Sequence, residues 1–163
     1  MDVKEILEND VRYIRAYLEK FKKETMPNLG PFEDIADQLH SLSWDYTERE
    51  WKGLRSSFVL RTADAFGEDM KIATILAALM QLEQDWILIH DDQEDKSELR
   101  RGRPALYRIE GVGEDIAINV GDRVRTLADK MFGIALWQCP NELSHTLYSG
   151  VCENSIKSRQ HQI

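Results

Sequence analysis

The chain has 163 residues, 42% of them hydrophobic, and a formal net charge of −8 at pH 7. This length and apolar content suit one globular domain around a single core and exclude a disordered chain. The negative charge argues against general nucleic-acid binding, because contacts to a phosphate backbone need clustered Lys and Arg side chains. A small phosphate-bearing ligand stays open, since it needs only a few cations gathered in one place.

Targeting signals are lacking in the sequence. Residues 1–8 are acidic and amphipathic and have no apolar core of a signal peptide. The longest apolar stretch, residues 72–80, is too short to cross a bilayer. Cys139 and Cys152 are too few and too far apart for a disulfide framework or a thiolate zinc site. We therefore expect a cytoplasmic protein with two reduced thiols and no transmembrane segment.

The hydrophobic pattern is that of an all-α protein, with one helical domain over residues 1–163. Apolar residues recur near the helical period, and we find no strand-like alternation, internal repeat or low-complexity tract. Prolines and glycines separate the periodic segments and mark the helix ends. The predicted helices cover residues 3–24, 32–42, 48–66, 70–89 continuing into an acidic cluster, 113–137 and 142–157.

Two of these helices have explicit start signals. Thr47, with Glu50 three residues later, matches a capping box and predicts a helix from about Glu48. Another helix is expected to start after Asp69. It is apolar on nearly every side, which predicts a buried central helix.

Four carboxylates within five residues follow this central helix: Asp91, Asp92, Glu94 and Asp95. If the helix continues, Asp91 and Asp95 lie one turn apart on one face, with Asp92 beside them. Like charges at this spacing repel, and a helix C-terminus favours cations. A bound Mg²⁺ would offset both the repulsion between the carboxylates and their unfavourable place at a helix C-terminus. It prefers carboxylate, water and phosphate oxygens as ligands. The alternative is a solvated acidic helix end.

Arginines follow the acidic cluster at once, at Arg100, Arg101 and Arg103, with Arg108 close behind. Carboxylates that hold a metal ion and arginines that hold phosphate oxygens are the two halves of a diphosphate site. We therefore interpret residues 91–102 as a magnesium–diphosphate site. The alternative is that the arginines only neutralise the acids in surface ion pairs.

The string Asp91-Asp92-x-x-Asp95, followed after four residues by Arg100-Arg101-Gly102, resembles the first aspartate-rich motif of the trans-isoprenyl (polyprenyl) diphosphate synthases. The resemblance is strongest over residues 45–137. It implies an all-α helical bundle similar to the first half of the isoprenoid synthase fold.

Further motifs of that family stand in the same order. Residues 51–56 resemble its Gly-Lys-x-x-Arg-Pro motif, with Lys52 and Arg55 retained and Trp51 and Ser56 in place of the glycine and the proline. Gln84 stands seven residues before the first aspartate, where the family has His or Gln. Residues 103–107 and 117–122 also resemble the stretch that follows the arginine pair in the family.

The resemblance implies a role for each matched residue. Asp91, Asp92 and Asp95 would hold Mg²⁺ against the diphosphate of an allylic substrate. Arg100 would bind that same diphosphate. The residues implied to bind isopentenyl diphosphate are Lys52, Arg55, Gln84 and Arg101.

The family's reaction is ionisation of the allylic carbon–oxygen bond, attack by the isopentenyl double bond and loss of a proton. Metal and cationic side chains suit that step, because they stabilise charge on the departing diphosphate. Trp86 and Ile87 stand just before the first aspartate, where the family sets product length, and a large ring there implies a short product of farnesyl or geranylgeranyl size. The alternative is that Trp86 is ordinary core.

The family's synthases also carry a second aspartate-rich motif in a C-terminal half. No second such string occurs here, and residues 160–163 resemble at most a remnant of a later family segment. One hypothesis is a component of a split or heteromeric prenyltransferase, whose partner chain supplies the second motif. Another is a truncated, non-catalytic diphosphate-binding or regulatory subunit. The retained acidic and cationic residues favour the first, and the replacements at Trp51 and Ser56 favour the second.

A third hypothesis, from another class of enzymes, is a metal phosphohydrolase of the His-Asp type, suggested by His40, His90, Asp91 and Asp122. It leaves Asp92, Asp95 and the arginine pair unexplained. Under the half-barrel hypothesis, core-facing residues should lack covering helices, namely Leu79, Ile87 and Leu127. Burial against a partner or a second copy is then expected, so we predict a homo- or hetero-oligomer.

Overall fold

The computed structural model describes residues 2–27 and 30–140, together with residues 144, 146, 148 and 149. The described part is all-helical apart from one small hairpin, which confirms the predicted fold class. Its elements are α1 (Val3–Glu24), η1 (Gly30–Phe32), α2 (Glu33–Glu48), α3 (Leu54–Phe66), α4 (Met70–Glu94), β1 (Leu99–Arg100), β2 (Arg103–Pro104), η2 (Leu106–Arg108) and α5 (Gly113–Gln138).

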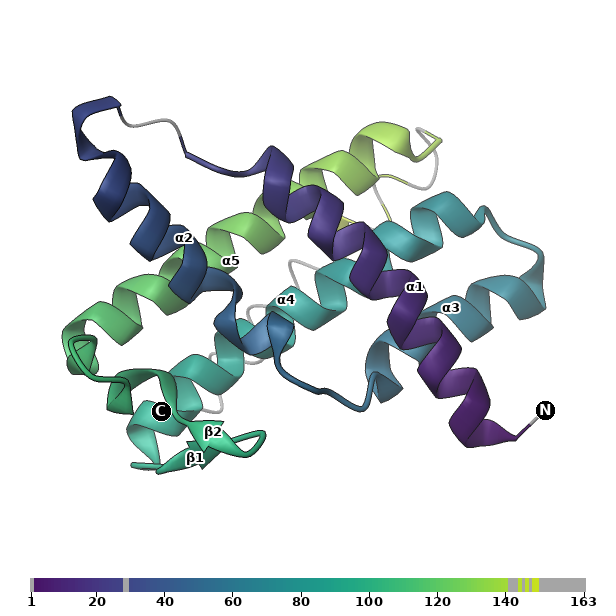
Figure 1. Ribbon diagram of the computed structural model, residues 1–163. Helices are drawn as coiled ribbons and strands as arrows, with labels where there is room; N and C mark the ends of the chain where they lie inside the picture. The colour runs from purple at the N-terminus through teal and green to yellow at the C-terminus, as the bar shows by residue number, and fades with distance from the viewer. Residues whose placement is uncertain (1, 28–29, 141–143, 145, 147, 150–163) are drawn as a thin grey trace.

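Helix α4 is the central element. It packs lengthwise against α5 and also contacts α1, α2 and α3, while α1 crosses over α3 and α4 (Figure 1). The predicted helix start after Asp69 is confirmed, and the Asp69 side chain caps the helix by accepting a hydrogen bond from the backbone N–H of Lys71 over 2.8 Å. Core residues occupy successive turns of α4 and include Ala77, Ala78 and Leu82, all fully buried. The prediction of a buried central helix is therefore confirmed.

By length and composition, α4 could also cross a membrane. More than half of its most apolar stretch, 56%, is buried inside the protein, and core helices of soluble proteins pass the same test. The apolar character of α4 is therefore accounted for by its place in the core.

The predicted helix boundary at Thr47 is wrong. Helix α2 continues to Glu48, and Thr47 lies within it, buried, with its hydroxyl donating to Asp85 Oδ2 over 2.8 Å. A buried carboxylate needs donors, and Thr47 supplies one instead of capping a helix. Helix α3 begins only at Leu54, after Gly53.

Gly53 has a positive φ of 68°, and a Cβ there would lie 2.2 Å from Cγ2 of Val11. Both the conformation and the space therefore require glycine. The loop before α3 consequently runs against α1, which fixes where the following Leu54 and Arg55 emerge.

The predicted helix over residues 142–157 lies largely outside the described residues. The prediction that Leu79 and Leu127 lack covering helices is wrong, since each side chain is buried and only 6% exposed. Both side chains belong to the core that the helices share. Ile87, by contrast, is 43% exposed on α4.

Candidate active site

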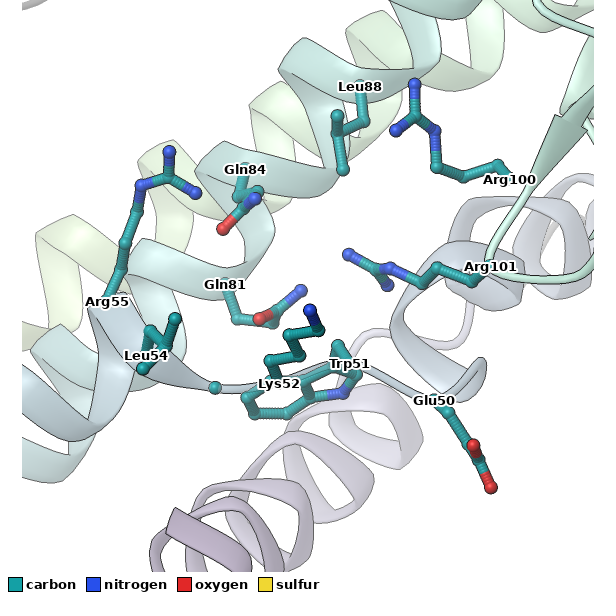
Figure 2. Close-up of a pocket in the computed structure, with 11 residues that line it drawn as sticks. Glu50, Trp51, Lys52, Leu54, Arg55, Gln81, Gln84, Leu88, Arg100 and Arg101 are labelled. Carbon is teal, nitrogen blue, oxygen red and sulfur yellow. The ribbon is translucent and has the colours of Figure 1, made fainter. Parts of the chain in front are cut away.

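A cleft of about 580 Å³ opens between the start of α3, the C-terminal half of α4 and the β1–β2 hairpin (Figure 2). The four residues predicted to bind one diphosphate all line it, although they lie up to 49 positions apart in the sequence. Arg100 lines it as well. The complete lining is Glu50, Trp51, Lys52, Gly53, Leu54, Arg55, Gln81, Gln84, Leu88, Arg100 and Arg101.

The cleft is strongly cationic. Lys52, Arg55 and Arg101 extend toward its interior in Figure 2, while the acidic Glu50 points away from it. Over the part of the chain that the structure describes, no ion pair joins Lys52 or Arg55 to a carboxylate, and both residues are exposed. Uncompensated cations around one cleft create a positive potential that favours an anionic ligand.

The two arginines of the site are presented by a very short hairpin. Its strands pair in antiparallel fashion with Leu99 opposite Pro104 and Arg100 opposite Arg103. The connecting residues Arg101 and Gly102 have φ values of 51° and 76°. Positive φ at both central residues is the signature of a tight two-residue hairpin turn. The turn gives successive arginines different directions, so both reach the cleft.

Arg101 is paired with a carboxylate that the sequence analysis did not identify. It donates to Asp85 Oδ1 over 2.8 Å, and Asp85 also accepts hydrogen bonds from Gln81 and Thr47, each over 2.8 Å. Burial raises the pKa of Asp85, while the charge of Arg101 and the three hydrogen bonds oppose this rise. An Asp inside an otherwise apolar helix is the sequence signal that could have found it.

Asp92 is fully buried and pairs with Arg100. Its oxygens Oδ1 and Oδ2 accept hydrogen bonds from Nε of Arg100 over 2.9 and 3.0 Å, and Oδ2 also accepts one from the Tyr46 hydroxyl over 2.6 Å. The hydrogen bond to Asp92 raises the pKa of Arg100. The pKa of Tyr46 is also raised, mainly by burial of its hydroxyl and secondly by the hydrogen bond to Asp92. Asp92 therefore acts as the counter-ion of Arg100 in this structure.

Asp91 and Asp95 remain accessible. The Asp91 side chain is 48% exposed, with Oδ2 3.8 Å from Arg100 Nη2, and Asp95 is exposed at the end of α4. The backbone N–H of Asp95 donates to the Asp91 carbonyl over 2.8 Å, which stacks the two residues one turn apart as predicted. No group of three or more His, Cys, Asp or Glu side chains within the described residues is gathered for a metal ion. Two accessible carboxylates still fit Mg²⁺, which takes its remaining ligands from water and phosphate oxygens.

The two residues predicted to set product length lie on different sides of α4. Trp86 is half-buried and faces α5, where the Arg125 guanidinium lies 4.9 Å from its ring centroid. Ile87 is exposed. His90 lies beside Trp86 and 3.7 Å from Asp122. The described residues thus give no support to a His-Asp phosphohydrolase centre.

Comparison with known proteins decides the family. Residues 36–155, more than half of the chain, match the family model described as polyprenyl synthetase. The chain belongs to the polyprenyl synthetase family. The resemblance carried by the aspartate-rich motif is therefore confirmed.

Members of the polyprenyl synthetase family with similar sequences are short-chain synthases. A geranylgeranyl diphosphate synthase of Mycobacterium tuberculosis is 38% identical over 77 residues, which cover 47% of this chain and 21% of that protein. A short chain isoprenyl diphosphate synthase of Methanothermobacter thermautotrophicus is 33% identical over 106 residues, which cover 65% of this chain and 31% of that protein.

The fold agrees with this membership. The geranylgeranyl pyrophosphate synthetase from the archaeon Geoglobus acetivorans superposes with a TM-score of 0.80 at 24% identity, over 96% of this chain and 47% of that one. The described fold is therefore that of half an isoprenoid synthase. The chain spans about half the length of this relative, and its alignments with the two synthases above cover less.

Proposed function

We propose that the cleft binds isopentenyl diphosphate, and that the protein takes part in condensing it with an allylic diphosphate to a short-chain polyprenyl diphosphate. One observation carries this proposal. Lys52, Arg55, Gln84 and Arg101 come from three separate segments, yet all line one cationic cleft with Arg100. A diphosphate is the anion that such a set of charge-assisted donors suits.

The allylic substrate would bind beside this cleft, at the end of α4. Asp91 and Asp95 would hold Mg²⁺, with Arg100 close enough to bind the same diphosphate. Bound Mg²⁺ would supply Lewis-acid stabilisation of the negative charge on the departing diphosphate. Asp92 contributes by holding the Arg100 guanidinium in place through its side chain.

Within the cleft, the protein's own residues bind and orient the second substrate. Lys52 and Arg55 supply cations from one wall, and Arg101 supplies a third from the hairpin. Gln84, a neutral donor and acceptor on α4, fixes orientation without adding charge. Leu88 lies on the same lining and offers an apolar surface to a hydrocarbon chain. We propose that Trp86 and Ile87 restrict the product to farnesyl or geranylgeranyl size.

A partner that carries the second aspartate-rich motif completes the proposal. Large apolar side chains are exposed along α3 and α4, and exposed apolar patches mark protein–protein contacts. These side chains are Leu54, Phe58, Phe66, Met80 and Ile87, between 38% and 78% exposed. We propose that they are covered in a cytoplasmic homo- or hetero-oligomer.

The second candidate is a non-catalytic diphosphate-binding or regulatory subunit. Trp51 and Ser56 flank the Lys52–Arg55 pair where the family motif has glycine and proline, which favours this reading. Trp51 is partly buried and donates from its ring nitrogen to the Thr47 carbonyl over 3.2 Å. The replacement therefore leaves the cleft formed, and binding without turnover is chemically reasonable.

Prenyl transfer distinguishes the two candidates. The purified chain is incubated with labelled isopentenyl diphosphate, an allylic diphosphate and Mg²⁺, alone and with proteins that carry a second aspartate-rich motif. Transfer that requires both chains supports the split enzyme. Binding of isopentenyl diphosphate with no transfer under any pairing supports the non-catalytic subunit, and absence of both overturns the proposal.

A further inference from the structure

Arg49, which belongs to none of the family motifs above, directly follows α2 and has a completely buried side chain. Burying a guanidinium is costly unless a carboxylate and enough acceptors surround it. Asp45 supplies the charge, accepting from Nε of Arg49 over 2.7 Å. The guanidinium also lies over the Tyr46 ring, 4.5 Å from its centroid.

The remaining donors of Arg49 reach the backbone of the arginine hairpin. Nη1 donates to the carbonyl of Arg100 over 2.8 Å, and Nη2 donates to the carbonyl of Pro104 over 2.8 Å. These carbonyls belong to the two opposite strands. One side chain therefore holds both strands of the hairpin against α2.

The hairpin needs such support. Each strand has only two residues, and isolated two-stranded hairpins are marginal at best. Arg101 also adopts a positive φ, which is uncommon for a residue other than glycine. Ladder pairing alone is therefore a weak constraint on the directions of Arg100 and Arg101.

We propose that Arg49 is a positioning residue for the diphosphate cleft. By clamping both strands, it fixes the backbone from which Arg100 and Arg101 extend. Tyr46 assists from the same turn of α2, since Arg101 donates to its carbonyl and the N–H of Leu106 donates to its hydroxyl over 3.0 Å. The consequence for ligand affinity rests on the proposed function, whereas the clamp itself does not.

The test compares Arg49→Met and the milder Arg49→Lys with the wild-type chain. Lysine keeps the charge but cannot reach two carbonyls and a carboxylate in one plane. Arg61→Met is the matched control, because it removes a different arginine from a buried carboxylate, Asp10, far from the hairpin in sequence. Both variants remove an arginine from a largely buried carboxylate, with Asp10 3% and Asp45 13% exposed, so the effect of losing such a pair is shared between them.

The first readout is amide hydrogen exchange, which does not depend on any ligand. The N–H of Ala105 closes the hairpin by donating to the Glu98 carbonyl over 2.9 Å. We expect Arg49→Met to speed exchange at Ala105 and Leu106 about tenfold more than in the core of α4, and Arg61→Met to show no such local excess. Equal acceleration everywhere, or none at the hairpin, overturns the clamp.

The second readout is the affinity for inorganic diphosphate, measured by calorimetry below the unfolding range. We expect about tenfold weaker binding in Arg49→Met, an intermediate loss in Arg49→Lys and wild-type affinity in Arg61→Met. Local hairpin loosening with unchanged affinity overturns the positioning role. If the wild-type chain binds no diphosphate, the proposed function fails, and the exchange measurement still decides the clamp.

Discussion

Asp85 and Arg101 form a buried ion pair, in which Arg101 Nη2 lies 2.8 Å from Asp85 Oδ1. The Asp85 side chain is 1% exposed and the Arg101 side chain is 13% exposed. Seven residues further along α4, Asp92 pairs in the same way with Arg100. Arg100 and Arg101 of the hairpin thus each have their own buried carboxylate on the central helix. The cleft is therefore built on an internal ionic framework, and its exposed cations are Lys52 and Arg55.

Replacing Asp85 with Asn should destabilise the fold strongly. The change keeps the shape but leaves Arg101 without its buried counter-ion, and breaking a buried pair from one side costs about 3–5 kcal/mol. Urea unfolding measures the loss. Asp64→Asn is the control, since the Asp64 side chain is 63% exposed. A loss for Asp85→Asn no larger than that of the control would contradict the framework.

Replacing the accessible Asp91 and Asp95 should affect ligand binding, whereas replacing the buried Asp92 should affect stability. Asp91→Ala together with Asp95→Ala is expected to abolish Mg²⁺-dependent diphosphate binding, while the unfolding free energy changes by no more than about 0.5 kcal/mol. Asp92→Ala should instead lower stability by about 3 kcal/mol, because Arg100 and Tyr46 lose their shared acceptor. Calorimetry with and without Mg²⁺ and urea unfolding give both numbers. Unchanged affinity in the double variant would mean that the cluster is a solvated helix end.

Stability should fall in mild acid because of His40. Burial, with Arg123 and Lys22 nearby, lowers the pKa of His40 below its usual 6.5, although Asp37 and Glu48 act in the opposite direction. The folded protein then binds the His40 proton less readily than the unfolded chain does. The contribution of neutral His40 is fully present above pH 6.5 and is lost as the pH falls through the lower pKa of the folded state.

The check is urea unfolding of the wild type and His40→Gln at pH 7.5 and pH 5.5. Gln is never protonated but can still accept a hydrogen bond from Arg123, whose Nη2 lies 3.4 Å from His40 Nδ1. The wild type should lose more stability than the variant between the two pH values. Equal losses would show that other groups cause the acid sensitivity.

Much of the site could be predicted because several short strings of this chain resemble the motifs of a known family. That resemblance assigns Lys52, Gln84 and Arg101 to one ligand, and the structure brings them into one cleft. The starts of α1 and α4 and the end of α3 also follow from local signals such as Asp69 and Gly67.

The supporting residues could not be predicted in the same way. The local pattern around Thr47 predicts a helix cap, yet its hydroxyl donates a hydrogen bond to Asp85, 38 positions away. The partners of Arg49 lie 51 and 55 positions further along the chain. Strands of two residues leave no alternating pattern, so the hairpin was also missed. Long-range polar contacts depend on the assembled fold.

The measurement that tests the central claim most directly is a calorimetric titration of isopentenyl diphosphate into the chain. We predict one site per chain, with affinity about tenfold weaker in Lys52→Ala and again in Arg55→Ala, because each removes one charge-assisted contact. Lys71→Ala, at the far end of α4, should bind like the wild type. Absence of binding, or equal affinity in all four proteins, would contradict the assignment of the cleft.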